Sequence, residues 1–155
     1  DMLQIGDRVR VGPNAFSEVY LFGHKDPDAV SDRFVRLTLE SGEVLEISDI
    51  HLLYVGDKLR AAKDVQVGEF VLLSHGALKP VIHVDKMVAR GLFNPHTIHG
   101  DIVVNDIVCS SYTTLIPPIL AHMLLGPMRL MYRLMQWNVL GSVLEFGIRW
   151  QVPVI

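Results

Sequence analysis

The first 112 residues alternate between apolar and polar side chains, a pattern typical of half-buried β-strands. Apolar residues occupy every second position of 35–39, and the alternation resumes at 44–47 after a polar break that contains Gly42. A period of two residues on both sides of a short glycine-containing break indicates a hairpin with one buried face.

Further short strands are predicted on both sides of this hairpin. They lie at residues 8–11, 18–22, 70–73, 81–84 and 102–108. We expect the second of them to end at Gly23, in a polar turn over residues 25–28. Many β-branched strands separated by turns favour an all-β body.

The chain also repeats itself. Three segments recur in the same order: 3–9 as 65–71, 16–20 as 78–82, and 41–45 as 99–103. The separation of about 60 residues is longer than that of common solenoid and propeller repeats. We therefore predict two copies of one β-subdomain within residues 1–112, related by a pseudo-twofold axis that brings Gly6 onto Gly68.

The pattern changes after Tyr112. From Leu115 to Trp150 the formal charges are Arg129, Arg133, Glu145 and Arg149. Helical spacing of apolar residues, interrupted by prolines, predicts a helical extension over 113–155. An uncharged stretch, 110–128, contains three prolines and makes a poor membrane-spanning helix. The extension is expected to pack on the body or to lie in a lipid interface.

Composition narrows the function classes. The chain has 155 residues, 50% of them hydrophobic and 20% charged, and a net charge of −3, which together indicate one folded domain. No cluster of Lys and Arg is present, so nucleic-acid binding is not expected. A single cysteine, Cys109, excludes an internal disulfide and a cysteine-rich zinc site. Residues 1–4 do not predict a signal or transit peptide.

The clearest candidate for chemistry is the pair Ser48 and His51, at the end of the predicted hairpin. A hydroxyl three residues before a histidine can fix the ring's orientation and tautomer. Such a histidine can protonate a departing amide nitrogen. The alternative is a serine that caps a turn beside a buried histidine.

Other histidines carry weaker hypotheses. His24 is expected to be a partly exposed turn residue. His96 and His99 would form half of a zinc site, completed by His75 or His83, but their spacing does not make a full ligand set, so no metal is predicted. Cys109 is expected to behave as a small buried hydrophobe.

As a whole, the chain resembles the Hint module of the hedgehog C-terminal autoprocessing domain. The resemblance is carried by residues 3–9, 16–22, 48–53, 65–69, 91–100 and 104–112, and it continues through 120–122 and 126–130. It implies a fold of two pseudo-symmetric β-subdomains, with residues 1–112 as the β-domain and 113–155 as an extension.

The resemblance also implies an activity. Hint modules cut the peptide bond before their own first cysteine, whose thiol attacks the preceding carbonyl. The thioester is then resolved by a second nucleophile, which is a sterol in hedgehogs. His51 would be the acid and Ser48 its orienting hydroxyl, without a cofactor, and the substrate would be the protein's own N-terminal cargo.

This sequence departs from the family at three positions. The initiating cysteine is expected well upstream of Gly6, outside this chain, so the chain by itself is predicted to be inactive. His24 stands where hedgehogs have the aspartate that activates the sterol. An imidazole can act as a base, but another alcohol or water then becomes possible as acceptor. Ser111 replaces a cysteine, which excludes thiol exchange there.

Two hypotheses follow from these features. One is a self-processing module in the secretory pathway or outside the cell. The other is a non-catalytic binding module whose apolar tail contacts lipid or a partner protein. The absence of a long insert in the body argues against a DNA-cutting activity.

Overall fold

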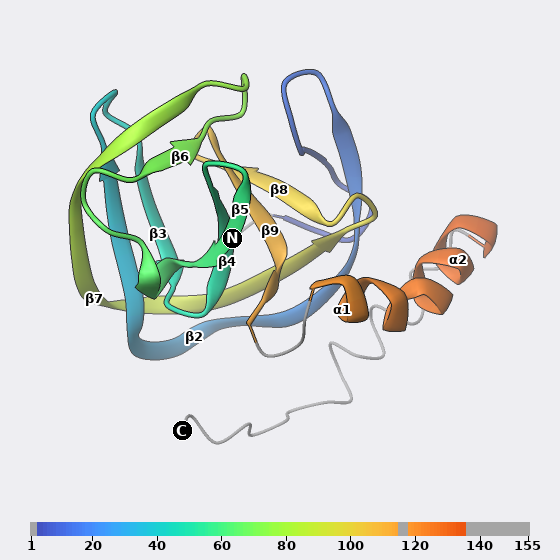
Figure 1. Cartoon of the computed structure of the whole chain (residues 1–155). Coiled ribbons are helices and arrows are strands. Elements are labelled where there is room, and N and C mark those ends of the chain that lie inside the picture. Colours follow the sequence, from blue (N-terminus) through green and yellow to red (C-terminus); the bar gives the residue numbers. More distant parts are fainter. Residues whose placement is uncertain (1–2, 115–117, 136–155) are drawn as a thin grey trace.

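The computed structural model describes residues 3–114 and 118–135 (Figure 1). The strands are β1 (Arg8–Arg10), β2 (Phe16–Leu39), β3 (Val44–Ser48), β4 (His51–Val55), β5 (Lys58–Ala61), β6 (Phe70–Leu72), β7 (Leu78–Thr97), β8 (Asp101–Val104) and β9 (Ile107–Thr113). A short 3-10 helix covers Ala62–Asp64, and the α-helices are α1 (Pro118–Leu124) and α2 (Gly126–Met135). The all-β prediction is confirmed, with two short helices near the C-terminal end.

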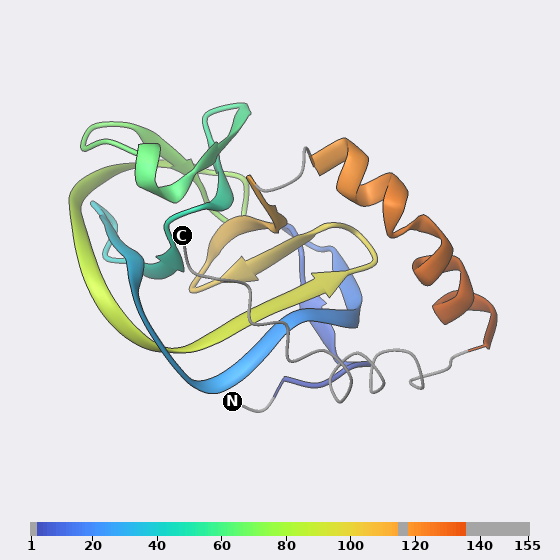
Figure 2. The same ribbon diagram turned by 90° about the horizontal axis from the view of Figure 1, so that it is seen from below.

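Two long antiparallel strands, β2 and β7, organise the sheet. They run side by side from Val19 opposite Thr97 to Leu39 opposite Val81 and curve around the other strands (Figures 1 and 2). The sheet order is β1-β2-β7-β6-β4-β9-β8, with β3 added to β2 and β5 to β4. The result is a nearly closed sheet around one core.

The predicted turn after Gly23 is wrong, because β2 continues through it. The polar residues form a bulge inside the strand instead: the register with β7 shifts between Asp26 and Val30. There, Asp26 Oδ1 accepts hydrogen bonds from the amides of Asp28 and Ala29. The strand predicted at 102–108 is likewise a hairpin of β8 and β9, which turns at Asn105 and Asp106 with positive φ angles.

The internal repeat is confirmed by matching hydrogen bonds. Gly6 N donates to Val19 O at 2.8 Å, and Gly68 N donates to Val81 O at the same distance. Both glycines have φ near +90°, a conformation that glycine adopts readily. The pairing of β1 with β2 and of β6 with β7 has the same register, with Val9 opposite Ser17 and Val71 opposite Lys79.

Bonds between the two copies show that a twofold axis relates them. The amide of Glu40 donates to Pro80 O at 3.0 Å, and the amide of Ile98 donates to Glu18 O at 3.0 Å. In the repeat, Glu18 corresponds to Pro80 and Glu40 corresponds to Ile98. The twofold relation therefore turns one of these hydrogen bonds into the other. The long strand of each copy therefore pairs with that of the other. The pseudo-twofold relation was predicted from the sequence, whereas this pairing of the long strands was not.

The core lies inside the curved sheet. It gathers buried aliphatic side chains from both copies: Val35, Leu37, Leu39, Leu45, Ile47, Leu53, Val71, Leu73, Val81, Ile102 and Ile107. The β2–β3 hairpin is confirmed, with Leu37 paired with Leu45 and its alternate residues buried. This rigid core fixes the ends of β3, β4 and β9, where polar side chains collect.

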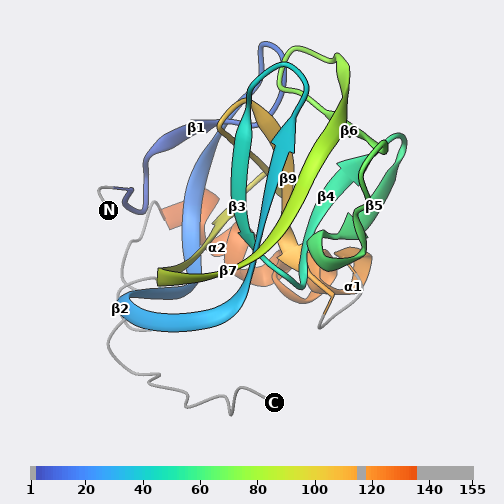
Figure 3. The same ribbon diagram turned by 90° about the vertical axis from the view of Figure 1, so that its left-hand side faces the viewer.

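The helices attach to one side of this body (Figures 1 and 3). Ala121 of α1 is buried against Leu52 and Tyr112, and Tyr132 Oη of α2 donates to Glu18 at 3.0 Å. The helical part of the prediction is therefore confirmed over 118–135, while 136–155 lies outside the described residues. Among the described helices, none has the length and apolar character needed to cross a bilayer.

Candidate functional site

The Ser48–His51 pair lies where β3 gives way to β4, and a two-residue turn brings both side chains together. Ser48 Oγ is 3.4 Å from His51 Nδ1. On the other side of the ring, His51 Nε2 is 3.0 Å from the carbonyl oxygen of Ser110 on β9. Because a carbonyl only accepts, Nε2 carries the proton, and Nδ1 is left as the acceptor next to the serine hydroxyl.

Burial keeps the His51 ring neutral. Desolvation lowers the pKa of His51, and its hydrogen bond to Ser110 opposes that shift in part. A neutral imidazole with a fixed tautomer can take a proton at Nδ1 and return it during a reaction. The Ser48 hydroxyl is within reach of the ring, and its role in orienting His51 stays a prediction.

A second buried histidine, His96, lies close to this centre. Burial lowers the pKa of His96 to about 4, and repulsion between two protonated rings, His96 and the nearby His51, acts in the same direction. Its ring packs on Tyr112 with centroids 5.6 Å apart, and Asn94 Nδ2 lies 3.4 Å from its Nε2. A Cβ at Gly23 would lie 2.8 Å from that Nε2, so glycine is required there. From the sequence, His96 was considered only as half of a zinc site, which was not predicted, and its place near His51 was missed.

The two histidines of the hypothetical zinc half-site, His96 and His99, differ in burial. His96 is buried, whereas the His99 side chain is 52% exposed and pairs with Asp101. Within residues 3–114 and 118–135, no group of three or more His, Cys, Asp or Glu residues gathers at a site that could hold a metal ion.

His24 occupies the middle of β2, opposite Asn94 of β7. Its side chain is exposed, and no hydrogen bond from its ring to another described residue is found. The structure therefore does not join His24 to Ser48 and His51 through hydrogen bonds.

Cys109 and Ser111 both lie in the buried part of β9. Burial and the charge of Asp101 raise the pKa of the Cys109 thiol to about 12, so the thiol stays protonated. This agrees with the expectation of a small buried hydrophobe. Ser111 is fully buried, and its Oγ accepts a hydrogen bond from the amide of Thr97 at 3.4 Å.

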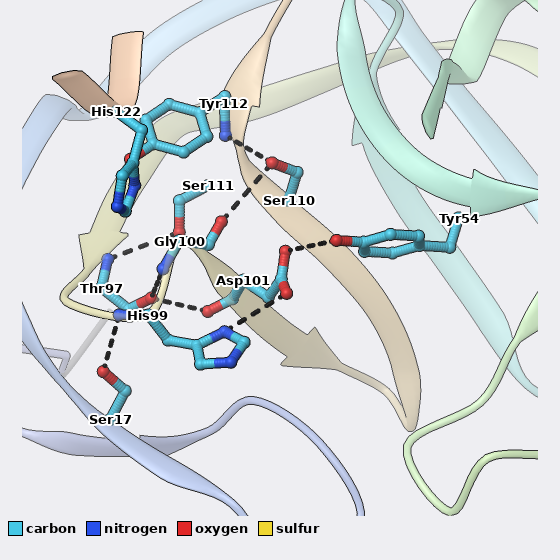
Figure 4. Close-up of polar contacts among 10 residues, drawn as sticks. All are labelled: Ser17, Tyr54, Thr97, His99, Gly100, Asp101, Ser110, Ser111, Tyr112 and His122. Atoms are coloured by element: carbon cyan, nitrogen blue, oxygen red, sulfur yellow. Dashed lines mark hydrogen bonds and ion pairs between the residues drawn. The ribbon is translucent and has the colours of Figure 1, made fainter. Parts of the chain in front are cut away.

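Next to this centre the structure contains a polar cluster that the sequence analysis did not single out (Figure 4). Asp101 accepts a hydrogen bond from Tyr54 Oη at 3.1 Å, and His99 Nδ1 lies 3.3 Å from its other oxygen. The cluster lines a pocket of about 300 Å³. A histidine two residues before an aspartate was the available signal, but the same spacing also occurs at His83 and Asp85.

Comparison with known proteins gives a family match. The Hint module family matches residues 1–154. Protein hedgehog of Drosophila virilis is 37% identical over 149 residues, covering 87% of this chain and 31% of that protein. Indian hedgehog B protein of Danio rerio is 30% identical over 176 residues, covering 99% of this chain and 42% of that protein. The chain thus spans less than half the length of these relatives.

Solved structures with the same fold include inteins. The crystal structure of the gp41-1 intein matches with a TM-score of 0.60 at 20% identity, covering 70% of this chain and 83% of that one. A bacterial intein-like domain from Clostridium thermocellum matches with a TM-score of 0.59 at 21% identity, covering 70% of this chain and 84% of that one. At these identities the likeness concerns the fold.

Proposed function

This chain belongs to the Hint module family, and from that premise we propose that it is the catalytic body of a self-processing protein. Its substrate is the peptide bond before a cysteine that precedes residue 1, and the segment before that cysteine is the cargo. The observation that carries the proposal is His51, whose ring is held between the Ser48 hydroxyl and the Ser110 carbonyl.

The first step is an intramolecular acyl transfer. The cysteine sulfur attacks the preceding carbonyl carbon, the new carbon–sulfur bond forms, and the carbon–nitrogen bond breaks. The thiol proton passes to His51 Nδ1 and from there to the departing nitrogen, so no external acid is needed. A neutral His51 suits this exchange, because it must accept a proton before it donates one. Holding both groups in one fold supplies a high effective concentration.

The second step is the transfer of the acyl group from sulfur to a sterol, another alcohol or water. Resemblance to hedgehogs assigns the activation of this acceptor to His24, which takes the place of an aspartate. An exposed imidazole can act as a base, although His24 has no hydrogen-bonded carboxylate to orient it within the described residues.

Contact with a membrane is a separate proposal that rests on the helices. They leave large apolar side chains exposed: Ile119, Leu120, Met123, Leu124, Leu130, Met131 and Leu134. Exposed apolar side chains on consecutive helices are typical of lipid or protein contact. A secretory or extracellular location would agree with the hedgehog resemblance.

The test uses the full-length product of the gene, with the residues that precede Asp1. Wild-type protein should release its N-terminal cargo when dithiothreitol is added, because thiols cleave a thioester. His51→Ala should slow this release by about 10²–10⁴, the usual range for losing an acid–base group. His83→Ala, at an exposed position on β7, is the matched control.

Two outcomes would contradict the proposal. Equal release by wild type and His51→Ala would remove His51 from the reaction. A wild-type protein that carries an upstream cysteine, folds and yet releases no cargo would favour the non-catalytic binding module.

A further inference from the structure

Another pocket lies between the start of β2 and helix α2. Its volume is about 480 Å³, within the range typical of small-molecule sites. Three hydrogen-bond donors line it from three elements: Arg8 of β1, Ser17 of β2 and Arg133 of α2. Phe16 and Ile98 add apolar surface beside them. The residues of the proposed reaction centre do not line it.

The two arginines of this pocket have no carboxylate partner, unlike most of the described arginines. Ion pairs with an aspartate or glutamate are formed by Arg10, Arg33, Arg36, Arg60 and Arg90. Within residues 3–114 and 118–135, no ion pair of Arg8 or Arg133 is found. Guanidinium groups bind phosphate and carboxylate oxygens through parallel N–H bonds, so two of them in one pocket favour an anionic ligand.

Arg8 has a carboxylate within reach along the sheet and does not pair with it. Glu18 lies directly opposite Arg8 where β1 pairs with β2, and opposite residues of antiparallel strands are near neighbours. Glu18 Oε2 instead accepts a hydrogen bond from Tyr132 Oη at 3.0 Å. The guanidinium carbon of Arg8 lies 6.0 Å from the centroid of the Phe16 ring. An arginine that stacks on a ring still presents the N–H groups of its edge to a ligand.

The Ser17 hydroxyl adds a third donor. Its Oγ accepts a hydrogen bond from the amide of His99 at 3.1 Å, which leaves the hydroxyl proton for another acceptor. Among the side chains that line the pocket, Glu18 is the one acidic group, against two arginines. The pocket therefore has an excess of positive charge together with a neutral donor.

The internal repeat shows that these charges are not needed to build the strand pair. In the second copy, Phe70 stands in the place of Arg8 and Pro80 in the place of Glu18, with the same register. The turn at Gly68 makes its hydrogen bond with these uncharged neighbours. The arginine in the first copy is therefore better explained by binding than by folding.

Helix α2 joins the pocket to an apolar surface. Leu130 and Leu134 are 57% and 74% exposed, and Arg133 lies three residues after the first of them. Residues three or four positions apart share a face of a helix. A ligand with an anionic head on the arginines and an apolar chain along these leucines would contact both surfaces. Phospholipids combine these two features in one molecule.

We propose that Arg8, Arg133 and the Ser17 hydroxyl bind the phosphate group of an anionic phospholipid. This inference rests on the membrane contact proposed above and names the lipid group that is recognised. The phosphate oxygens accept hydrogen bonds from the two guanidinium groups and from the serine, while the acyl chains lie along Leu130 and Leu134. No covalent bond changes, and the self-processing reaction is not involved.

The first experiment measures the binding of residues 1–155 to vesicles by co-sedimentation. One kind of vesicle is phosphatidylcholine with one fifth phosphatidic acid, whose phosphate is accessible, and the other is phosphatidylcholine alone. We expect the wild type to prefer the vesicles that contain phosphatidic acid. Arg8→Gln and Arg133→Gln should each weaken that binding about fivefold, the effect of one basic side chain at an anionic surface.

Arg90→Gln is the matched control, because it removes the same charge from an exposed arginine opposite Val30, away from the pocket. Binding should stay within about twofold of wild type, since attraction between exposed charges falls off within a Debye length. An equal loss in Arg90→Gln would indicate general charge attraction and would overturn the site. A wild type without preference for phosphatidic acid would overturn it as well.

A lysine variant tests whether the planar guanidinium group matters. Arg8→Lys keeps the charge but cannot form two parallel bonds to one phosphate. It should bind the vesicles with phosphatidic acid more weakly than the wild type and more tightly than Arg8→Gln. Circular dichroism of each variant reports whether it is folded. Binding of Arg8→Lys and Arg8→Gln that both equal the wild type would remove Arg8 from the site.

A further experiment asks whether a soluble phosphate occupies the same pocket. Inorganic phosphate is added to residues 1–155 at constant ionic strength, and the NMR signals of Arg8 Nε–H and of the Ser17 amide are followed. We expect shifts that chloride does not produce, and weaker binding than to vesicles, because acyl chains add contacts with α2. Inorganic phosphate that binds as tightly as the vesicles would assign the site to a soluble phosphate and overturn the lipid.

Leu134→Gln separates this inference from the membrane contact itself. The change removes an exposed apolar side chain of α2 and keeps both arginines. If the wild type binds both kinds of vesicle equally and Leu134→Gln weakens both, the membrane contact stands and the phosphate site fails. If the signals of Arg8 and Ser17 respond to inorganic phosphate but no vesicle binds, the membrane contact fails, and the lipid is overturned in favour of a soluble phosphate.

Discussion

His51 Nε2 lies 3.0 Å from the carbonyl oxygen of Ser110, a residue 59 positions further along the chain. The ladder between β4 and β9 shifts register at this point, from His51 opposite Thr113 to Leu53 opposite Cys109. The imidazole therefore bonds to a carbonyl inside the shifted segment. An irregularity in the sheet thus positions the ring, as β-bulges often do near active sites.

Ser48→Ala should slow thioester formation less than His51→Ala does. The serine contributes one hydrogen bond to the ring, at a distance of 3.4 Å, and such bonds contribute about 1 kcal/mol, equivalent to a factor of about five to ten in rate. Ser48→Thr keeps the hydroxyl and should restore most of the rate. Dithiothreitol-induced release from the full-length protein measures the effect. A Ser48→Ala protein as slow as His51→Ala would mean that the serine does more than orient the ring.

Acid should destabilise the protein through His96. Burial lowers the pKa of His96 to about 4, below its ordinary value of 6.5, so the unfolded chain binds a proton there more readily than the folded one. The free energy of unfolding should fall as the pH decreases from about 6.5 to 4, by roughly 2–3 kcal/mol through this residue. In His96→Leu this part of the pH dependence should disappear. Denaturant titrations at pH 7.5 and 4.5 measure it, with His83→Leu as an exposed control; an unchanged pH dependence in His96→Leu would contradict the argument.

The repeated turns should respond alike to substitution. Gly6 and Gly68 have φ angles of +95° and +91° and make equivalent hydrogen bonds. Alanine at either position should cost about 1–2 kcal/mol, because a side chain disfavours that backbone conformation. Gly12→Ala is the control, since the new Cβ would meet only Ala15 at an ordinary 3.7 Å. Thermal unfolding compares the three variants, and a loss at only one of the two turns would argue against their equivalence.

A cargo fused directly to Asp1 should stay attached when dithiothreitol is added. Cys109 is the only cysteine in these residues, and burial raises its pKa to about 12, so it cannot act as the nucleophile. Gel electrophoresis and mass spectrometry follow the fusion. Release of the cargo, abolished by Cys109→Ser, would show that a buried thiol reaches the junction.

The sequence by itself determined much of the architecture. Alternation at 35–39 and 44–47 predicted the β2–β3 hairpin because a two-residue period places all its apolar side chains on one face. The recurrence of 3–9 as 65–71 predicted the pseudo-twofold pair, because similar local sequences form turns with matching hydrogen bonds. Ser48 and His51 were found because they are three residues apart, so a local turn joins them.

The tertiary structure decided what depends on distant partners. A polar stretch after Gly23 reads as a turn, but pairing with β7 over many residues keeps β2 extended and leaves only a bulge. Whether a histidine is buried beside another, as His96 is, or exposed, as His24 is, depends on the strand that covers it. Likewise Tyr54 meets Asp101 across 47 residues of chain, and only the closing of the sheet brings them together. Local patterns encode local bonds, whereas burial and pocket walls arise from contacts between segments that the sequence keeps far apart.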